Sequence, residues 1–365
     1  MAAQVKRYLE NNPTTLLRVS NPRELLIKSL QRIVTSCPPS DTNRRGLFAG
    51  PTSIAYLFYH LSLTHFDLSI EGKSPRQWME AYLDLPQPVG DSEMAVLTRY
   101  GIVDERLCWT ALRAVAYQQH ELLDTVVKLG AMLPSEGDSK INELLFGGAG
   151  ALVVLRMVRT FAPSHAEQIN TAIASNIKVL LERRPWTLRG NRYLGPGHGD
   201  VGIIAQIVLS DHIQAKELKA DLAELLDLQQ PDGNWPVAPD EHSDLVQWCH
   251  GAPGFVIALE AIKELFPSLR ERIEQAVSKA RRCVWERGLL VKEPNLCHGI
   301  TGNALALKGE QKEHFLALTT PEKLKEVEWE PSKDPWCLFK GEAGRAWVWA
   351  QLTGGNKGFP AFTDI

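Results

Sequence analysis

The chain has 365 residues, of which 44% are hydrophobic and 23% are charged, and its formal net charge at pH 7 is −3. This composition is typical of a globular protein with a sizeable core and excludes disordered and collagen-like chains. The slightly acidic balance, without a long run of Lys and Arg, gives no electrostatic basis for binding nucleic acid or for strong binding to an anionic membrane. We therefore expect no nucleic-acid partner.

Residues 1–45 precede the recognisable repeats and are expected to form an N-terminal helical segment beside a main domain over residues 46–365. Residues 1–12 lack the apolar stretch of a signal peptide, and no later segment offers about 18 consecutive apolar residues for a transmembrane helix. Six cysteines at irregular positions, two of them followed directly by His, do not look like a secreted disulfide framework. The sequence thus predicts a cytoplasmic protein, with peripheral association at the plasma membrane left open.

A glycine motif, Gly-x-x-Gly followed by an apolar run, recurs along the chain. Its copies are, in chain order, a weaker one at 47–53 and clear ones at 145–150, 197–202, 249–254, 297–302 and 338–344. The leading glycines at 147, 199, 251, 299 and 341 are 52, 52, 48 and 42 residues apart, about the length of one helical hairpin. The 97 residues between Gly50 and Gly147 are almost two such lengths, so we expect a degenerate copy near 104–109. The sequence therefore predicts seven units.

Each unit is expected to contain an inner and an outer helix. Residues 254–265 are apolar on nearly all sides, which is typical of a helix buried on most of its surface. The next segment has a capping box, Ser268 with Glu271, and apolar residues at three- and four-residue steps until Gly288, which indicates an amphipathic helix. The predicted fold is therefore all-α: an α/α toroid, a double-layered ring of about seven inner and seven outer helices.

The motif glycines lie at the predicted N-terminal ends of the inner helices. We expect the missing side chains to let several helix ends converge around one axis. Converging helix N-termini carry exposed N–H groups and partial positive charge, which favour anions and thiolates. The chemistry is therefore expected at the centre of the ring, in the side chains that flank the glycines.

Two copies of the motif carry Cys-His-Gly, at 249–251 and 297–299. A single buried Cys is usually a packing residue, but two Cys-His pairs at one position of adjacent units bring ligands from different elements to one point, as a zinc site requires. Two thiolates with one imidazole leave the fourth tetrahedral position open, which is the catalytic pattern, and zinc deprotonates a thiol that binds there. His250 is either a fourth ligand or, as we prefer, a neighbouring group that contacts substrate. The remaining cysteines are expected to be packing residues: Cys37, Cys108, Cys283 and Cys337.

Three further residues are candidates for the site. His198 has the motif position of the two Cys-His pairs without a Cys, and an imidazole there can transfer protons; the alternative is a core histidine. Glu143, four residues before Gly147, is either a second acid–base group or a surface carboxylate. Lys292, five residues before Cys297, either binds a substrate carboxylate or phosphate or is an exposed lysine.

These motifs resemble those of the eukaryotic lanthionine synthetase C-like proteins. The resemblance is carried by 248–254, 296–299, 337–344 and the ending Phe359-Pro360-Ala361-Phe362, and it runs from about Gly46 to the C-terminus. It implies one zinc ion per chain, acid–base roles for His198 and Glu143, and contact of Lys292 with glutathione or phosphate. The zinc ligands that it implies are Cys249, Cys297 and His298.

The resemblance also implies a reaction: addition of a thiol, glutathione, to dehydroalanine or dehydrobutyrine in peptides or proteins, with phosphate elimination from phosphoserine or phosphothreonine as a further activity. The partners would be glutathione and a dehydrated or phosphorylated peptide or protein. Bacterial members are peptide lanthionine cyclases with an arginine shortly before the first zinc cysteine, where this chain has Leu245, which argues against ring closure. The alternatives are a non-catalytic scaffold that binds zinc and glutathione, and a prenyltransferase β-like ring, which the Cys-Cys-His set disfavours.

Overall fold

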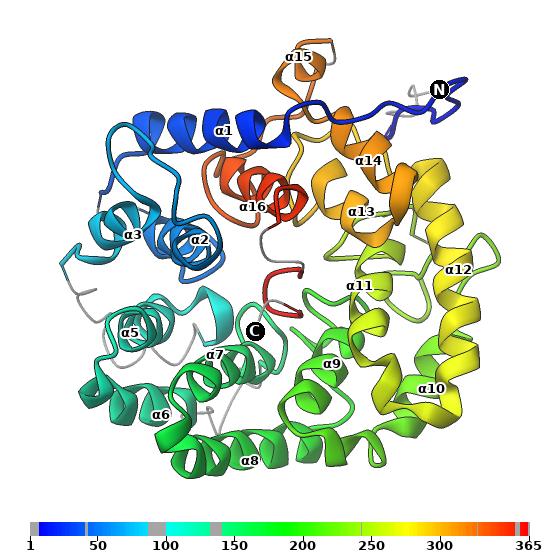
Figure 1. Ribbon diagram of the computed structural model, residues 1–365. Helices are drawn as coiled ribbons and strands as arrows, with labels where there is room; N and C mark the ends of the chain where they lie inside the picture. The colour runs from blue at the N-terminus through cyan, green and yellow to red at the C-terminus, as the bar shows by residue number, and fades with distance from the viewer. Residues whose placement is uncertain are drawn as a thin grey trace.

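The computed structural model describes residues 7–40, 43–86, 100–131, 141–241, 243–326, 328–354 and 358–363. Within these ranges the chain is helical, and its β-pairing is limited to isolated bridges (Figure 1). Among the described residues, seven helices form an inner ring in which each contacts the next and the last contacts the first. They are α2 (Pro51–Thr64), α5 (Glu105–Ala116), α7 (Gly148–Phe161), α9 (Asp200–Ser210), α11 (Ala252–Ile262), α13 (Ile300–Ala306) and α16 (Glu342–Leu352). The predicted α/α toroid is confirmed.

In the part of the chain that the structure describes, six outer helices each follow and pack against an inner helix: α3 (Pro75–Leu83), α6 (Leu123–Ala131), α8 (Ala166–Glu182), α10 (Lys219–Asp227), α12 (Arg270–Arg287) and α14 (Gly309–Ala317). The short helix α15 (Pro321–Leu324) follows α14. The outer partner of α16 is α1 (Pro22–Ser36), from the other end of the chain (Figure 1). An ion pair between Arg32 and the buried Glu342 joins these two helices. The ring is thus closed by the N-terminal segment, while a domain boundary at residue 45 stays a prediction.

The burial of α11 and α12 follows the predicted inner and outer patterns. Nine of the eleven residues of α11 are buried, whereas α12 buries one face, from Ile273 to Val284. The predicted capping box is wrong. A short 3₁₀ turn, Pro267–Leu269, precedes α12 and contains Ser268, so the helix begins at Arg270 without a side-chain cap. The local pattern could not reveal that Pro267 starts a separate turn.

The motif glycines have a different main role from the one expected. A Cβ atom on Gly302 would lie 2.0 Å from the carbonyl oxygen of Leu296, and one on Gly254 would lie 2.0 Å from that of Trp248. Both carbonyls belong to the turn that leads into the same helix, so the glycines chiefly let each turn double back over its own first helical residues. Close approach between units contributes at Gly254, whose Cβ would also lie 2.3 Å from Pro196.

The degenerate second copy is confirmed, because α5 begins at Glu105 within the predicted segment. Asp104 is its N-cap, and its carboxylate accepts a hydrogen bond of 2.8 Å from the backbone N–H of Leu107. The inner helices that begin after a motif glycine have no side-chain cap, from α7 through α16. A capping side chain therefore marks the unit that lost the glycines.

The described C-terminal residues, 358–363, lie at the centre of the ring (Figure 1). The ring of Phe359 stacks on Trp248, with centroids 4.9 Å apart, and the carbonyl oxygen of Ala361 accepts hydrogen bonds from Arg156 and Gln206 on α7 and α9. Because Trp248 directly precedes Cys249, the C-terminal segment supports the turn that carries the first Cys-His pair.

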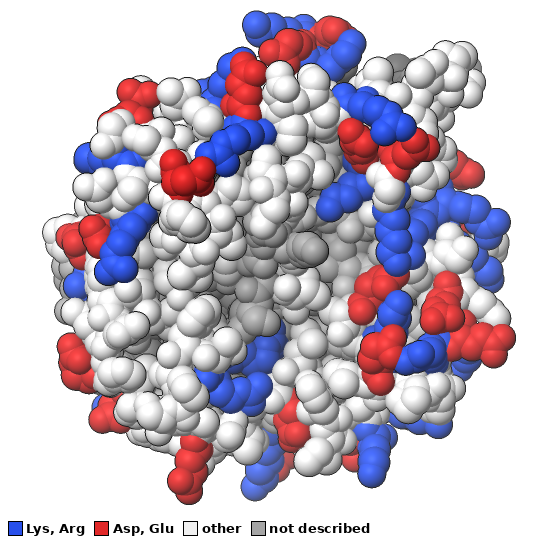
Figure 2. Space-filling model, viewed as in Figure 1, with Lys and Arg blue, Asp and Glu red and all other residues white. Residues whose placement is uncertain are grey.

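Figure 2 shows one face of the ring, with acidic and basic side chains interspersed mainly around its rim. Among the described residues, no helix is both long and apolar enough to cross a membrane. Cytoplasmic location and peripheral membrane association stay predictions.

Candidate metal centre

The turns before the inner helices bring equivalent motif positions together at the ring axis. The residue just before the leading glycine is Phe146, His198 and His250 in three successive units. Their rings are neighbours, with centroids 6.4 Å apart for the first pair and 5.7 Å apart for the second. The prediction that the copies converge is confirmed.

Backbone hydrogen bonds between turns place the two motif cysteines side by side. The N–H of Cys249 donates to the carbonyl of Cys297 over 3.1 Å, and the N–H of Cys297 donates to the carbonyl of Phe339 in the next unit over 2.8 Å. These bonds join the turns of adjacent units at equivalent residues, so the side chains at this motif position lie next to one another near the ring axis. Both thiols are buried, with 6% and 5% of the residue exposed.

Cys249, Cys297 and His298 lie together and form a candidate metal site. Their three ligand atoms all lie within 4.8 Å of one another. Ligands at zinc–sulfur and zinc–nitrogen bond lengths in a tetrahedron would be roughly 3.5 Å apart, which this arrangement can accommodate with small movements. The His298 backbone N–H donates to the Asn295 side chain over 2.9 Å, which holds the turn that presents the imidazole.

The donor chemistry of this group fits a soft divalent metal ion. A hydrogen bond from the Cys297 thiol holds the pKa of Cys249 well below its usual range, whereas that bond and burial raise the pKa of Cys297. A cation bound to both sulfurs would take the place of the thiol hydrogen between them. Thiolate and imidazole ligands favour zinc over magnesium or calcium.

Beside this group, the half-buried His198 pairs with the buried Glu143. Nδ1 of His198 lies 3.1 Å from a carboxylate oxygen of Glu143, which is only 2% exposed. The same carboxylate accepts backbone N–H bonds from Leu145 and Phe146, at 2.8 and 2.6 Å, so its position is fixed. Burial opposes protonation of His198, but the bond and charge of Glu143 outweigh it and raise the pKa of the imidazole.

His250 lies beside the candidate ligands and outside their group. Its imidazole stacks against His198, and its Nδ1 is buried without a hydrogen-bond partner among the described residues. Burial lowers the pKa of His250, so the neutral ring is favoured. The substrate-binding role of His250 stays a prediction.

Lys292 reaches the centre through a residue that the sequence analysis missed. Its Nζ donates to Oε1 of Gln247 over 3.4 Å, and Nε2 of Gln247 donates to the sulfur of Cys249 over 3.1 Å. In the sequence, only the position of Gln247 two residues before Cys249 points to this role. A single glutamine at that position does not by itself indicate a contact with the metal ligand.

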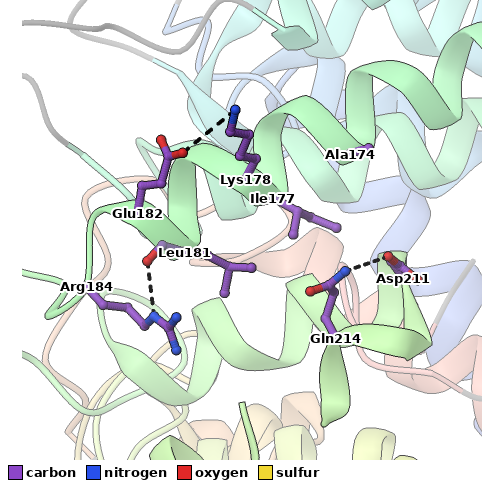
Figure 3. Close-up of a pocket in the computed structure, with 8 residues that line it drawn as sticks. All are labelled: Ala174, Ile177, Lys178, Leu181, Glu182, Arg184, Asp211 and Gln214. Atoms are coloured by element: carbon purple, nitrogen blue, oxygen red, sulfur yellow. Dashed lines mark hydrogen bonds and ion pairs between the residues drawn. The ribbon is translucent and has the colours of Figure 1, made fainter. Parts of the chain in front are cut away.

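The remaining cysteines lie outside the metal group, and Cys108, Cys283 and Cys337 are buried as expected for packing residues. A separate cavity of about 450 Å³ lies on the outside of the ring, between α8 and the 3₁₀ segment His212–Ala215 (Figure 3). It shares no residue with the metal group, and its Lys178 and Glu182 pair with each other over 3.9 Å. This cavity is therefore separate from the candidate metal site.

A family model described as lanthionine synthetase C-like protein matches residues 111–314, more than half of the chain. The chain belongs to this family. This lanthionine synthetase C-like chain is 29% identical over 221 residues to a zebrafish (Danio rerio) protein named glutathione S-transferase LANCL1, a match that covers 53% of this chain and 54% of the relative. It is also 29% identical over 249 residues to the LanC-like protein GCL1 of Arabidopsis thaliana, covering 60% of this chain and 57% of the relative. The matches thus span little more than half the length of these curated relatives.

A solved structure named nisin cyclase has the same fold. It superposes on 91% of this lanthionine synthetase C-like chain and 93% of its own, with a TM-score of 0.58 and 14% sequence identity. With 14% sequence identity, the structural similarity supports the toroid fold alone and gives no evidence about the reaction.

Proposed function

We propose that this protein holds one zinc ion through Cys249, Cys297 and His298 and adds glutathione to dehydroalanine or dehydrobutyrine residues of peptides or proteins. The observation that carries the proposal is the group of two buried thiols and one imidazole beside the His198–Glu143 pair. The name of the zebrafish relative supports glutathione as the thiol. A zinc ion with three protein ligands would lower the pKa of a thiol at its open position.

The chain's own residues would complete the addition. The thiol sulfur bonds to the β-carbon of the dehydrated residue, and the α-carbon then takes up one proton. His198 is the proposed donor of that proton, since its pKa is raised and Glu143 fixes the ring. Proton transfer by a positioned imidazole contributes about 10²- to 10⁴-fold.

Lys292 is the proposed contact for an anionic group of the substrates. An ammonium near the thiolates suits a carboxylate of glutathione or the phosphate of phosphoserine or phosphothreonine. Elimination of that phosphate, with removal of the α-proton, would generate the dehydrated residue that the addition consumes.

The first prediction is that the purified protein contains about one zinc ion per chain and that Cys249→Ala, Cys297→Ala and His298→Ala each lose it, because two remaining ligands bind zinc weakly. Elemental analysis measures the metal, and Cys283→Ala, a buried cysteine outside the group, serves as the matched control. Full zinc in the Cys297→Ala protein would remove the assignment. Zinc and glutathione binding without turnover on a dehydroalanine peptide would favour the scaffold alternative.

A further inference from the structure

Gln247 is held rigidly next to the candidate metal ligand Cys249. Its side chain is almost completely buried, with 7% of the residue exposed. Its backbone exchanges two hydrogen bonds with His250, of 3.1 and 3.2 Å, which close the tight turn around Trp248 and Cys249. The amide group therefore has little freedom to leave the sulfur to which it donates.

The orientation of the Gln247 amide is determined by its two partners. A lysine ammonium has only donors, so the oxygen Oε1 must face Lys292, and the NH₂ group must then face the sulfur of Cys249. Zinc binds cysteine as the thiolate, and a hydrogen bond to an ionised acceptor is stronger than one to a neutral acceptor, so a donor held 3.1 Å from this sulfur would stabilise it as a zinc ligand. An ammonium on the amide oxygen polarises the amide and strengthens its N–H donors.

We propose that Gln247 is a positioning residue that links the Lys292 ammonium to the Cys249 thiolate and thereby tunes the affinity of the site for zinc. This inference rests on the proposed function for the zinc ion, and it assigns Lys292 a second role besides contact with the substrate. Hydrogen-bond partners that orient metal ligands typically contribute 10- to 100-fold to metal affinity.

The test compares zinc affinity in four variants by competition with a chromophoric chelator. Gln247→Leu removes both hydrogen bonds at similar side-chain size, and we expect it to weaken zinc binding by about 10- to 100-fold. We expect Lys292→Met to weaken it less, and the double variant to be no worse than Gln247→Leu, because both changes break one chain of contacts. Gln275→Leu, an exposed glutamine on α12, is the matched control and should leave the affinity unchanged.

A second measurement reports directly on the sulfur. In the cobalt-substituted protein, Gln247→Leu should shift the sulfur-to-cobalt charge-transfer absorption, whereas a merely structural defect would lower the folded fraction without moving the band. Unchanged zinc affinity and an unchanged cobalt band in Gln247→Leu would overturn the inference. Fully additive losses for Gln247→Leu and Lys292→Met would overturn the link between them. Absence of zinc from the wild-type protein would instead defeat the proposed function on which the inference rests.

Discussion

His198 and His298 occupy the same position of two repeats, and their neighbours give them different chemistry. His298 follows Cys297 and groups with two thiols, whereas His198 follows Gly197 and pairs with the buried Glu143. One repeat position thus supplies a candidate metal ligand in one unit and a candidate proton donor in another. Two features make the difference: the residue before the histidine, which is Cys297 in one unit and Gly197 in the other, and the carboxylate of Glu143, which comes from another unit and contacts only His198 of the two.

At the residue scale we predict that His198→Asn retains zinc and glutathione binding but lowers the rate of thiol addition by about 10²- to 10⁴-fold, because the proton donor is lost. Metal content, glutathione affinity and turnover on a dehydroalanine peptide are measured for this variant. His212→Asn, an exposed histidine that follows α9, is the control and should behave as wild type. Loss of zinc would make His198 a ligand, and unchanged turnover would leave it a packed core histidine.

At the element scale, α5 shows how a repeat unit survives without its glycines. Asp104 caps the helix while lying in a buried position, and this burial raises its pKa to about 6. An aspartate in the unfolded chain titrates near 3.9, so the folded protein binds more protons between these two values. Stability contributed by Asp104 is therefore complete below about pH 4 and is lost as the pH rises through about 6.

We predict that Asp104→Asn keeps the cap and removes this pH dependence, because Asn caps as well as Asp and carries no charge. The variant should match wild type near pH 4 and exceed its free energy of unfolding by about 1–3 kcal/mol at pH 7.5. Asp104→Ala should also lose the pH dependence, but at every pH it should be about 0.5–2 kcal/mol less stable than Asp104→Asn because the cap is missing. Urea midpoints at pH 4.5, 6 and 7.5 measure both effects, and a variant with Asn that keeps the wild-type slope would show that another group titrates.

At the scale of the whole molecule, the ring is closed by elements from its two ends. Helix α1 supplies the outer layer for α16, and residues further towards the N-terminus continue along the ring, where Leu9 donates a backbone bond of 2.7 Å to Leu289. In a closed ring every inner helix packs against two neighbours, so the loss of one helix also destabilises the helices beside it. The N-terminal segment is therefore expected to unfold together with the rest.

We predict that Leu30→Ala, a fully buried position in α1, destabilises the whole protein by about 2–5 kcal/mol in a single unfolding transition. Lys28→Ala, on the exposed side of the same helix, should change the free energy of unfolding by less than about 0.5 kcal/mol. Urea unfolding followed by tryptophan fluorescence and by circular dichroism measures both. A separate early transition confined to helical signal would instead support an independent segment over residues 1–45.

The sequence by itself determined the repeat, the all-helical ring, and the cysteines and histidines brought to its axis. It could do so because a glycine motif at regular spacing fixes the position of each flanking side chain within its own unit, and equivalent positions converge once the units form a ring. The same reasoning located the second unit without its glycines, since the double gap required a helix there.

Only the tertiary structure decided which distant residues meet. Glu143 and His198 are 55 residues apart, and Gln247 and Lys292 are 45 apart, so local patterns carry no information about either contact. The pairing of α1 with α16, which joins Arg32 to Glu342 across 310 residues, depends in the same way on the number of units that complete the ring. Burial then sets the chemistry of these contacts, because desolvation and a single hydrogen-bond partner decide which form of each group is favoured.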